Sequence, residues 1–191
     1  PPKYVAKPPK PRHFQRLCLT FTHQTLSYFH CGEKWVVVGK NSSNWAMSSF
    51  KGSYNYSVDD KGRINIPAKL RKFLSTDAND TFVITRGYER CLFVYPFDEW
   101  ERLERAIREL STTDRQNRFF TRTLLEKATD SALDGQSRIT VPRELLQYAG
   151  IENDVLILGV LERIELWNPV VYEQYRATQE EPYEAVAQRV L

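Results

Sequence analysis

Apolar and polar residues alternate along two short stretches after residue 50, which is the pattern of strands with one buried face. Residues 54–58 and 63–66 both show this alternation. The sequence Asp-Asp-Lys-Gly between them is typical of a turn, and Gly62 suits a positive φ there. Pro67 suits the first position of a short helix. With the apolar runs that follow, the pattern predicts a β-hairpin, a helix and a second strand pair.

This pattern occurs twice. The offset is 75 residues for the hairpin and helix and slips to 73 by the last strand. Thr-Phe-Val-Ile at 81–84 aligns with Val-Leu-Ile-Leu at 155–158, and Glu89 with Glu162. Gly150 follows the second helix as an expected C-terminal cap. One such unit is too small to bury both faces of its strands, so two units must interlock. The matched residues of the repeated motif are Asp59 with Asp134, Arg63 with Arg138, and Pro67 with Pro142.

Apolar residues at three- and four-residue spacing from Phe97 to Leu110 predict a linking helix between the units, and Asp114 can cap a second one. The tail is expected to be helical, with a break at Pro182. Asp98, Glu99 and Glu101 are expected to form a solvated face. The acidic residues expected to lie away from the hairpins are Asp98, Glu99, Glu101, Glu104, Glu173, Glu180, Glu181 and Glu184. The predicted division is a leader, a first unit, a helical linker, a second unit and a C-terminal helical tail: 1–46, 51–97, 98–127, 128–171 and 172–191.

Residues 1–46 differ in composition from the rest of the chain. They carry seven lysines and arginines against one acid, whereas the remaining residues carry 20 bases and 23 acids. Half of the ten prolines fall in the first eleven residues, and only Trp35–Val38 reads as a strand. Because Met47 is the only methionine, we expect the natural start at or near it and a disordered or non-native leader. The alternative is a basic arm that adds nonspecific DNA affinity.

The sequence offers little for catalysis. All three histidines lie in the leader, and the three cysteines show no C-x-x-C spacing. A Gly-rich phosphate loop and a G-x-S-x-G motif are both absent. We therefore expect a protein that is not an enzyme, with no catalytic residues, metal, cofactor or small-molecule substrate. The chain also lacks an apolar run of the roughly 18 residues that a membrane helix needs, so we expect no membrane partner and a cytoplasmic protein.

Arg63 and Arg138 are the candidate DNA-contacting residues. Each follows a hairpin turn, and the aspartate four residues earlier can hold the guanidinium in one orientation. An arginine held in this way suits guanine O6 and N7, or a phosphate. The open alternative is that Asp-x-x-x-Arg only closes the hairpin. Lys61, Lys69, Arg71, Lys72 and Arg143 are expected to add phosphate affinity, and Asp59, Asp134, Gly62, Pro67 and Pro142 to support the motif.

The repeated motif resembles the MraZ family, whose units are of the AbrB/SpoVT swapped-hairpin class. The resemblance rests on Phe-Lys-Gly-x-Tyr at 50–54, on Asp-x-Lys-Gly-Arg-x-x-Ile-Pro-Ala-Lys-x-Arg at 59–71, and on Leu-Asp-x-x-x-Arg-Ile-x-Val-Pro at 133–142. It covers residues 47 to about 175. One departure is that the second turn, Gly-Gln-Ser, has no lysine, so the two copies need not contribute equally to DNA binding.

The resemblance implies an α+β, mainly β fold, in which two pseudo-symmetric AbrB-like units form a double-split β-barrel with linking helices. It also implies a ring-shaped homo-oligomer and a nucleoid-associated transcriptional repressor. Such a repressor binds repeated boxes of double-stranded promoter DNA, including those of its own cell-division and cell-wall operon. The alternative function is an AbrB-like oligomerising interaction module or an antitoxin-type protein binder.

Overall fold

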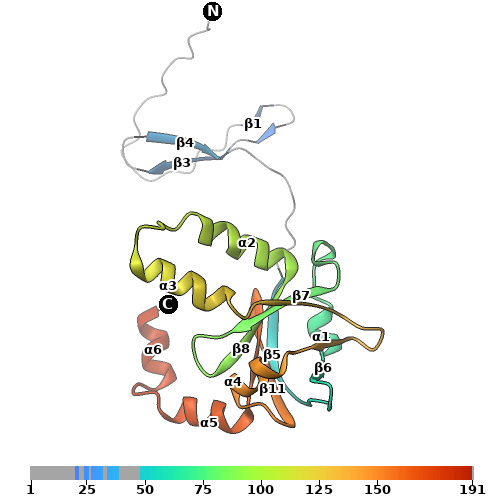
Figure 1. Ribbon diagram of the computed structural model, residues 1–191. Coiled ribbons are helices and arrows are strands. Elements are labelled where there is room, and N and C mark those ends of the chain that lie inside the picture. Colours follow the sequence, from blue (N-terminus) through green and yellow to red (C-terminus); the bar gives the residue numbers. More distant parts are fainter. Residues whose placement is uncertain (1–19, 22–23, 26, 32–33, 39–47, 191) are drawn as a thin grey trace, which may run out of the picture. The chain divides into compact units, whose positions relative to one another are not determined.

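The computed structural model describes residues 20–21, 24–25, 27–31, 34–38 and 48–190 (Figure 1). The chain divides into two compact units, Pro1–Trp45 and Ala46–Leu191. In the first unit, two antiparallel strand pairs are described: β1 (Thr20–Phe21) with β2 (Gln24–Thr25), and β3 (Ser27–Cys31) with β4 (Lys34–Val38). The expected strand at Trp35–Val38 is therefore present. Three further strands, β1, β2 and β3, fall within the predicted leader, where no strand was expected. The other leader residues lie outside the described residues, and their disorder stays a prediction.

The second unit contains both copies of the repeat. Its strands are β5 (Phe50–Ser57), β6 (Arg63–Asn65), β7 (Thr81–Arg86), β8 (Cys91–Pro96), β9 (Thr129–Ala132), β10 (Arg138–Thr140), β11 (Asp154–Leu161) and β12 (Arg163–Trp167). Its helices are α1 (Ala68–Arg71), the 3₁₀ helix η1 (Thr76–Ala78), α2 (Phe97–Arg108), α3 (Arg115–Leu125), α4 (Arg143–Ala149), α5 (Pro169–Ala177) and α6 (Tyr183–Val190). None of the described helices is both long enough and apolar enough to cross a membrane.

The two copies exchange strands. The main sheet is antiparallel with the order β5-β11-β12-β8-β7-β9, so the first strand of each copy pairs with the third strand of the other. Tyr54 faces Ile157 in one exchanged pair, and the equivalent residues Thr129 and Ile84 face each other in the second. Within the first hairpin only an isolated bridge from Val58 to Ile64 remains. This exchange confirms the predicted α+β fold of two interlocked swapped-hairpin units.

A pseudo-twofold axis relates the copies where β6 and β10 form their own antiparallel pair. Ile64 faces Ile139, which is its counterpart in the second copy. The neighbouring register is symmetric too, since Arg63 faces Thr140 and Arg138 faces Asn65. The polar residues that flank the two isoleucines are therefore brought together from both motifs.

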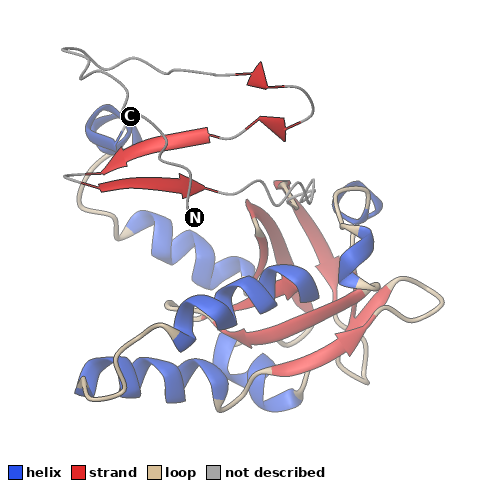
Figure 2. Cartoon of the chain, turned by 90° about the horizontal axis from the view of Figure 1, so that it is seen from above, coloured by secondary structure: helices blue, strands red, loops and turns tan. Residues whose placement is uncertain are grey.

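Alternate residues of the sheet face two separate apolar clusters. The inward face forms the barrel interior, where Ile64, Ile139 and Ile157 have no exposed surface. The outward face is covered by α2, α3 and α5, which pack Trp100, Leu124 and Tyr172 against it (Figure 2). This second cluster contains most of the apolar stripe of the predicted linker. Both clusters lie wholly within the second unit.

The helix ends largely follow the local signals. Asp114 caps α3 by accepting hydrogen bonds from the backbone N–H groups of Gln116 and Asn117, at 2.7 and 3.0 Å. Gly150 ends α4 in the left-handed conformation, as predicted. Pro67 and Pro142 take the N-cap rather than the expected first helical position, because both have extended ψ angles.

The prediction that the acidic residues at the start of α2 face solvent is wrong for two of these carboxylates. Asp98 and Glu99 are each only 5% exposed, whereas Glu101 is exposed. Both lie in the first turn of the helix, where its dipole favours negative charge. Asp98 accepts a hydrogen bond from the Ser75 hydroxyl at 2.8 Å, because η1 packs against this end of α2.

Ser137 occupies a backbone conformation that favours glycine. It has φ +61°, and its counterpart Gly62 has φ +76°. Since a Cβ in the left-handed region costs about 1 kcal/mol, we expect Ser137→Gly to raise the free energy of unfolding by up to about 1 kcal/mol. Gly62→Ala is the matched control and should destabilise, because its Cβ would lie 2.7 Å from the Val141 carbonyl oxygen. Urea denaturation measures the stability of both variants. A Ser137→Gly variant less stable than the wild type would contradict a cost of the serine side chain in this backbone conformation.

Candidate nucleic-acid interface

The first Asp-x-x-x-Arg motif is a closed hydrogen-bonded loop. Asp59 Oδ1 accepts the backbone N–H groups of Lys61 and Arg63, both at 2.9 Å. Its Oδ2 accepts the Nε and Nη2 groups of Arg63, both at 2.6 Å. The turn is closed further by the backbone N–H of Gly62, which donates to the Asp59 carbonyl at 2.8 Å. The aspartate thus shapes the turn and holds one edge of the guanidinium.

The second motif repeats this geometry. Asp134 Oδ1 accepts the backbone N–H groups of Gln136 and Arg138 at 2.9 and 3.0 Å. Its Oδ2 accepts Arg138 Nε at 2.8 Å and Nη2 at 2.6 Å. Gln136 replaces the lysine of the first turn, but the hydrogen bond to the aspartate is kept, because the backbone N–H at this position donates it. The two copies therefore differ in charge and not in shape.

The two motifs meet in one group, which we term the Asp–Arg cluster: Asp59, Arg63, Asp134 and Arg138. Arg138 Nη1 lies 3.9 Å from Asp59 Oδ2, an ion pair that joins the copies. The backbone N–H of Val141 donates to the Gly62 carbonyl at 2.9 Å, which ties the second copy to the turn of the first. The sequence predicted two separate arginine sites, and pairing of β6 with β10 brings them together.

The charges of this cluster are set by its hydrogen bonds. The side-chain hydrogen bond from Arg63 lowers the pKa of Asp59 to about 2, and that from Arg138 lowers the pKa of Asp134 to about 2. The hydrogen bond to Asp59 in turn raises the pKa of Arg63. Both carboxylates are therefore ionised near neutral pH, so the guanidinium groups keep their partners under cellular conditions.

Each arginine is held by its own aspartate on the Nε–Nη2 edge, and they differ at Nη1, which in Arg138 lies 3.9 Å from Asp59. The side chains of Arg63 and Arg138 remain 29% and 23% exposed. A guanidinium has five N–H donors in a planar fork, and Asp59 takes only those of the Nε–Nη2 edge of Arg63. Within the described residues, Nη1 of Arg63 makes no hydrogen bond. The cluster therefore presents oriented donors that can bind an acceptor pair from outside.

The other predicted basic residues surround this cluster in sequence, and most are exposed. Lys69 and Arg71 belong to α1, and Lys72 follows it directly. Arg71 is half-buried, and its Nε–H donates to the carbonyl of Ile66 at 3.1 Å. This hydrogen bond stabilises the backbone just after β6. The predicted cations that are exposed are Lys61, Lys69, Lys72 and Arg143.

Sequence reasoning missed two polar residues beside the arginines. Asn65 faces Arg138, and its Nδ2 donates to the Gln136 carbonyl at 3.1 Å. Thr140 is its counterpart and faces Arg63. The alignment at an offset of 75 residues already matched these positions, but only strand pairing shows that each lies next to the arginine of the other copy.

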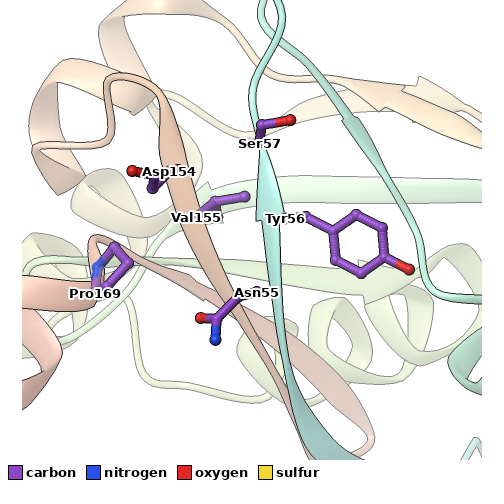
Figure 3. A pocket seen from close by; sticks show the side chains of 6 residues that line it. All are labelled: Asn55, Tyr56, Ser57, Asp154, Val155 and Pro169. Atoms are coloured by element: carbon purple, nitrogen blue, oxygen red, sulfur yellow. The ribbon is translucent and has the colours of Figure 1, made fainter.

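A shallow hollow lies elsewhere on the molecule, at the edge where β5 pairs with β11. Asn55, Ser57, Asp154 and Pro169 line it, and Figure 3 shows Tyr56 pointing to the other side of β5 from Asn55. None of the predicted site residues lines this hollow. In the described part of the chain, no three His, Cys, Asp or Glu side chains are grouped as metal ligands.

Two swapped hairpins in one chain, with an Asp–Arg pair at each turn, define a fused dimer of AbrB-like units. The sequence pattern of the MraZ protein family, described as antitoxin-like, matches twice, at residues 49–123 and 124–191. The chain belongs to the MraZ family.

Two curated relatives carry the name transcriptional regulator MraZ. That of Natranaerobius thermophilus is 41% identical over 142 residues, which cover 74% of this chain and 96% of the relative. That of Halothermothrix orenii is 42% identical over 138 residues, which cover 72% and 94%.

Proposed function

We propose that this chain is a DNA-binding transcriptional regulator, and that it represses its own cell-division and cell-wall operon. The observation that carries this proposal is the Asp–Arg cluster, which holds two guanidinium groups on one strand pair with donors open to solvent. The names of the relatives support the same function. We place the protein in the cytoplasm, associated with the nucleoid.

Arg63 and Arg138 would supply the base contacts in this proposal. An arginine that reads guanine must present two donors to O6 and N7 at once, which a fixed fork does at low entropic cost. The exposed cations would bind phosphates and supply affinity without sequence preference: Lys61, Lys69, Lys72 and Arg143. Asn65 and Thr140 lie beside the arginines and are candidates for further contacts.

The first copy should dominate binding. Its turn and helix carry Lys61, Lys69 and Lys72, whereas the second copy offers Gln136 at the turn and only Arg143 on its helix among the predicted cations. Glu144, next to Arg143, forms an ion pair with Lys127. The pseudo-symmetric backbone therefore presents an asymmetric charge to the DNA.

Binding to the DNA directly upstream of the gene tests this function. We expect the full chain to bind this duplex more tightly than a scrambled duplex of equal length, in fluorescence anisotropy. Affinity for both should fall as salt rises, because each neutralised phosphate releases counterions. Equal affinity for both duplexes would contradict sequence-specific regulation, and capture of a protein partner without DNA would favour the antitoxin-type alternative.

We also propose that the protein assembles into a closed ring, which would set several Asp–Arg clusters along repeated promoter boxes. Exposed apolar side chains support an interface between copies, namely Phe73, Tyr88, Phe119, Leu161 and Val170, each more than half exposed. A ring would combine weak contacts through effective concentration.

Light scattering of the full chain at micromolar concentration measures this assembly. We expect a single species whose mass is a multiple of the 22.4 kDa chain. Phe119→Ser should shift the population towards smaller species if that side chain lies in the interface. If only a 22.4 kDa monomer is found, the ring is contradicted. The proposed DNA contact does not depend on this result and is tested by the anisotropy experiment.

A further inference from the structure

The start of the second unit is held by a buried carboxylate. Ser48 is only 3% exposed, and its backbone N–H donates to Glu99 Oε1 at 3.2 Å. Glu99 also accepts two hydrogen bonds from Arg102 Nη1, both at 2.8 Å. Glu99 is thus paired with one cation and with one neutral backbone amide.

Two buried polar atoms, one in Asp98 and one in Ser48, have no hydrogen-bond partner within the described residues. Asp98 Oδ2 is paired with the Ser75 hydroxyl, but its Oδ1 is one of these two atoms. The other is the Ser48 hydroxyl oxygen. A buried polar atom without a partner costs free energy, and a buried charge costs more. The helix dipole at the start of α2 offsets part of this cost and supplies no donor to the unpaired Asp98 oxygen.

We propose that this site binds the α-ammonium group of Ser48, as the first residue of a chain from which Met47 has been removed. The nitrogen that would carry the positive charge is the one already 3.2 Å from Glu99. An ammonium has two more N–H donors than an amide, and its positive charge would add to that of Arg102 in balancing the buried Glu99.

The step that creates this group is a hydrolysis. Water breaks the amide bond between Met47 and Ser48, its hydroxyl goes to the methionine carbonyl carbon, and the serine nitrogen leaves as an amine that becomes protonated. A methionine aminopeptidase removes an initiator methionine when the next residue is small, and serine is small.

The family pattern begins at residue 49, two residues after Met47. Both apolar clusters lie within Ala46–Leu191, so a chain of residues 47–191 contains a complete core.

Expression from Met47 tests the proposal in two measurements. Intact mass spectrometry should show a product that begins at Ser48. In urea denaturation, E99Q should raise the unfolding constant about tenfold more in this chain than in the chain of residues 1–191, where Ser48 carries an amide. E101Q changes an exposed carboxylate of the same helix and should act equally in both chains.

A third measurement uses the wild-type chain, so it still tests the proposal if E99Q fails to fold. The α-amine of the folded wild-type chain should react with an acylating reagent at least tenfold more slowly than in urea. Retention of Met47, an equal effect of E99Q in both chains, or an α-amine that reacts as fast folded as unfolded would each overturn the proposal.

Discussion

Arg63→Ala is expected to reduce affinity for the upstream promoter duplex by about tenfold or more, because a bidentate arginine–guanine contact commonly contributes this much discrimination. The thermal stability of the variant should change little. The Arg63–Asp59 pair is partly open to water at the end of a turn, and ion pairs of this kind contribute little to folding. Anisotropy titrations and thermal melts of the same preparation separate the two effects.

Three variants determine what Arg63 does on the DNA. Arg63→Lys keeps the charge and loses the fork, so it should recover nonspecific binding and not the preference for the promoter sequence. Arg138→Ala should cost less than Arg63→Ala, because the first copy carries more exposed lysines. Lys72→Ala should weaken promoter and scrambled DNA alike. If Arg63→Ala lowers the melting temperature and leaves DNA affinity unchanged, the Asp–Arg cluster only closes the hairpins.

Ile64→Ala is expected to lower the free energy of unfolding by about 2–5 kcal/mol, the range for truncating a fully buried isoleucine. Ile64 has no exposed surface and faces Ile139 on the pseudo-twofold axis. Because the same short strand carries Arg63, partial loss of the β6–β10 pair should also weaken DNA binding. Urea denaturation with parallel DNA titrations measures both losses.

Controls for this prediction come from the symmetry of the fold. Ile139→Ala should cost a similar amount, since it removes the partner of the same pair, and Ile64→Val should cost only about 0.5–1.5 kcal/mol. The double alanine variant should lose less than the two single losses together, because the side chains share one contact. Tyr183 is 79% exposed, so Tyr183→Ala should be nearly neutral. A loss at Ile64 as small as that at Tyr183 would show that β6 is not part of the core.

Much of the candidate site could be predicted from local sequence. The turn at residues 59–62 and the aspartate-to-arginine spacing each depend on residues within five positions of one another, and such short-range geometry follows from residue type. The left-handed turn position was evident at Gly62 but hidden at Ser137, where a serine occupies the same conformation. The burial of Asp98 and Glu99 was not predictable, because a helical pattern of charge does not show what packs against the first turn.

The sequence by itself determined that there are two copies of one unit and where several helices begin and end. Its alternation correctly marked Ile64 and Ile66 as buried, but it also placed Tyr56 on a buried face, and Tyr56 is 37% exposed. Only the tertiary structure decided that β5 pairs with β11 and β9 with β7, so that each hairpin divides its strands between the copies. The physical reason is that backbone hydrogen-bonding groups are the same along every strand, and a two-residue period specifies a buried face and not a partner. In the same way, the pairing of β6 with β10 joins Arg63 and Arg138 in one cluster.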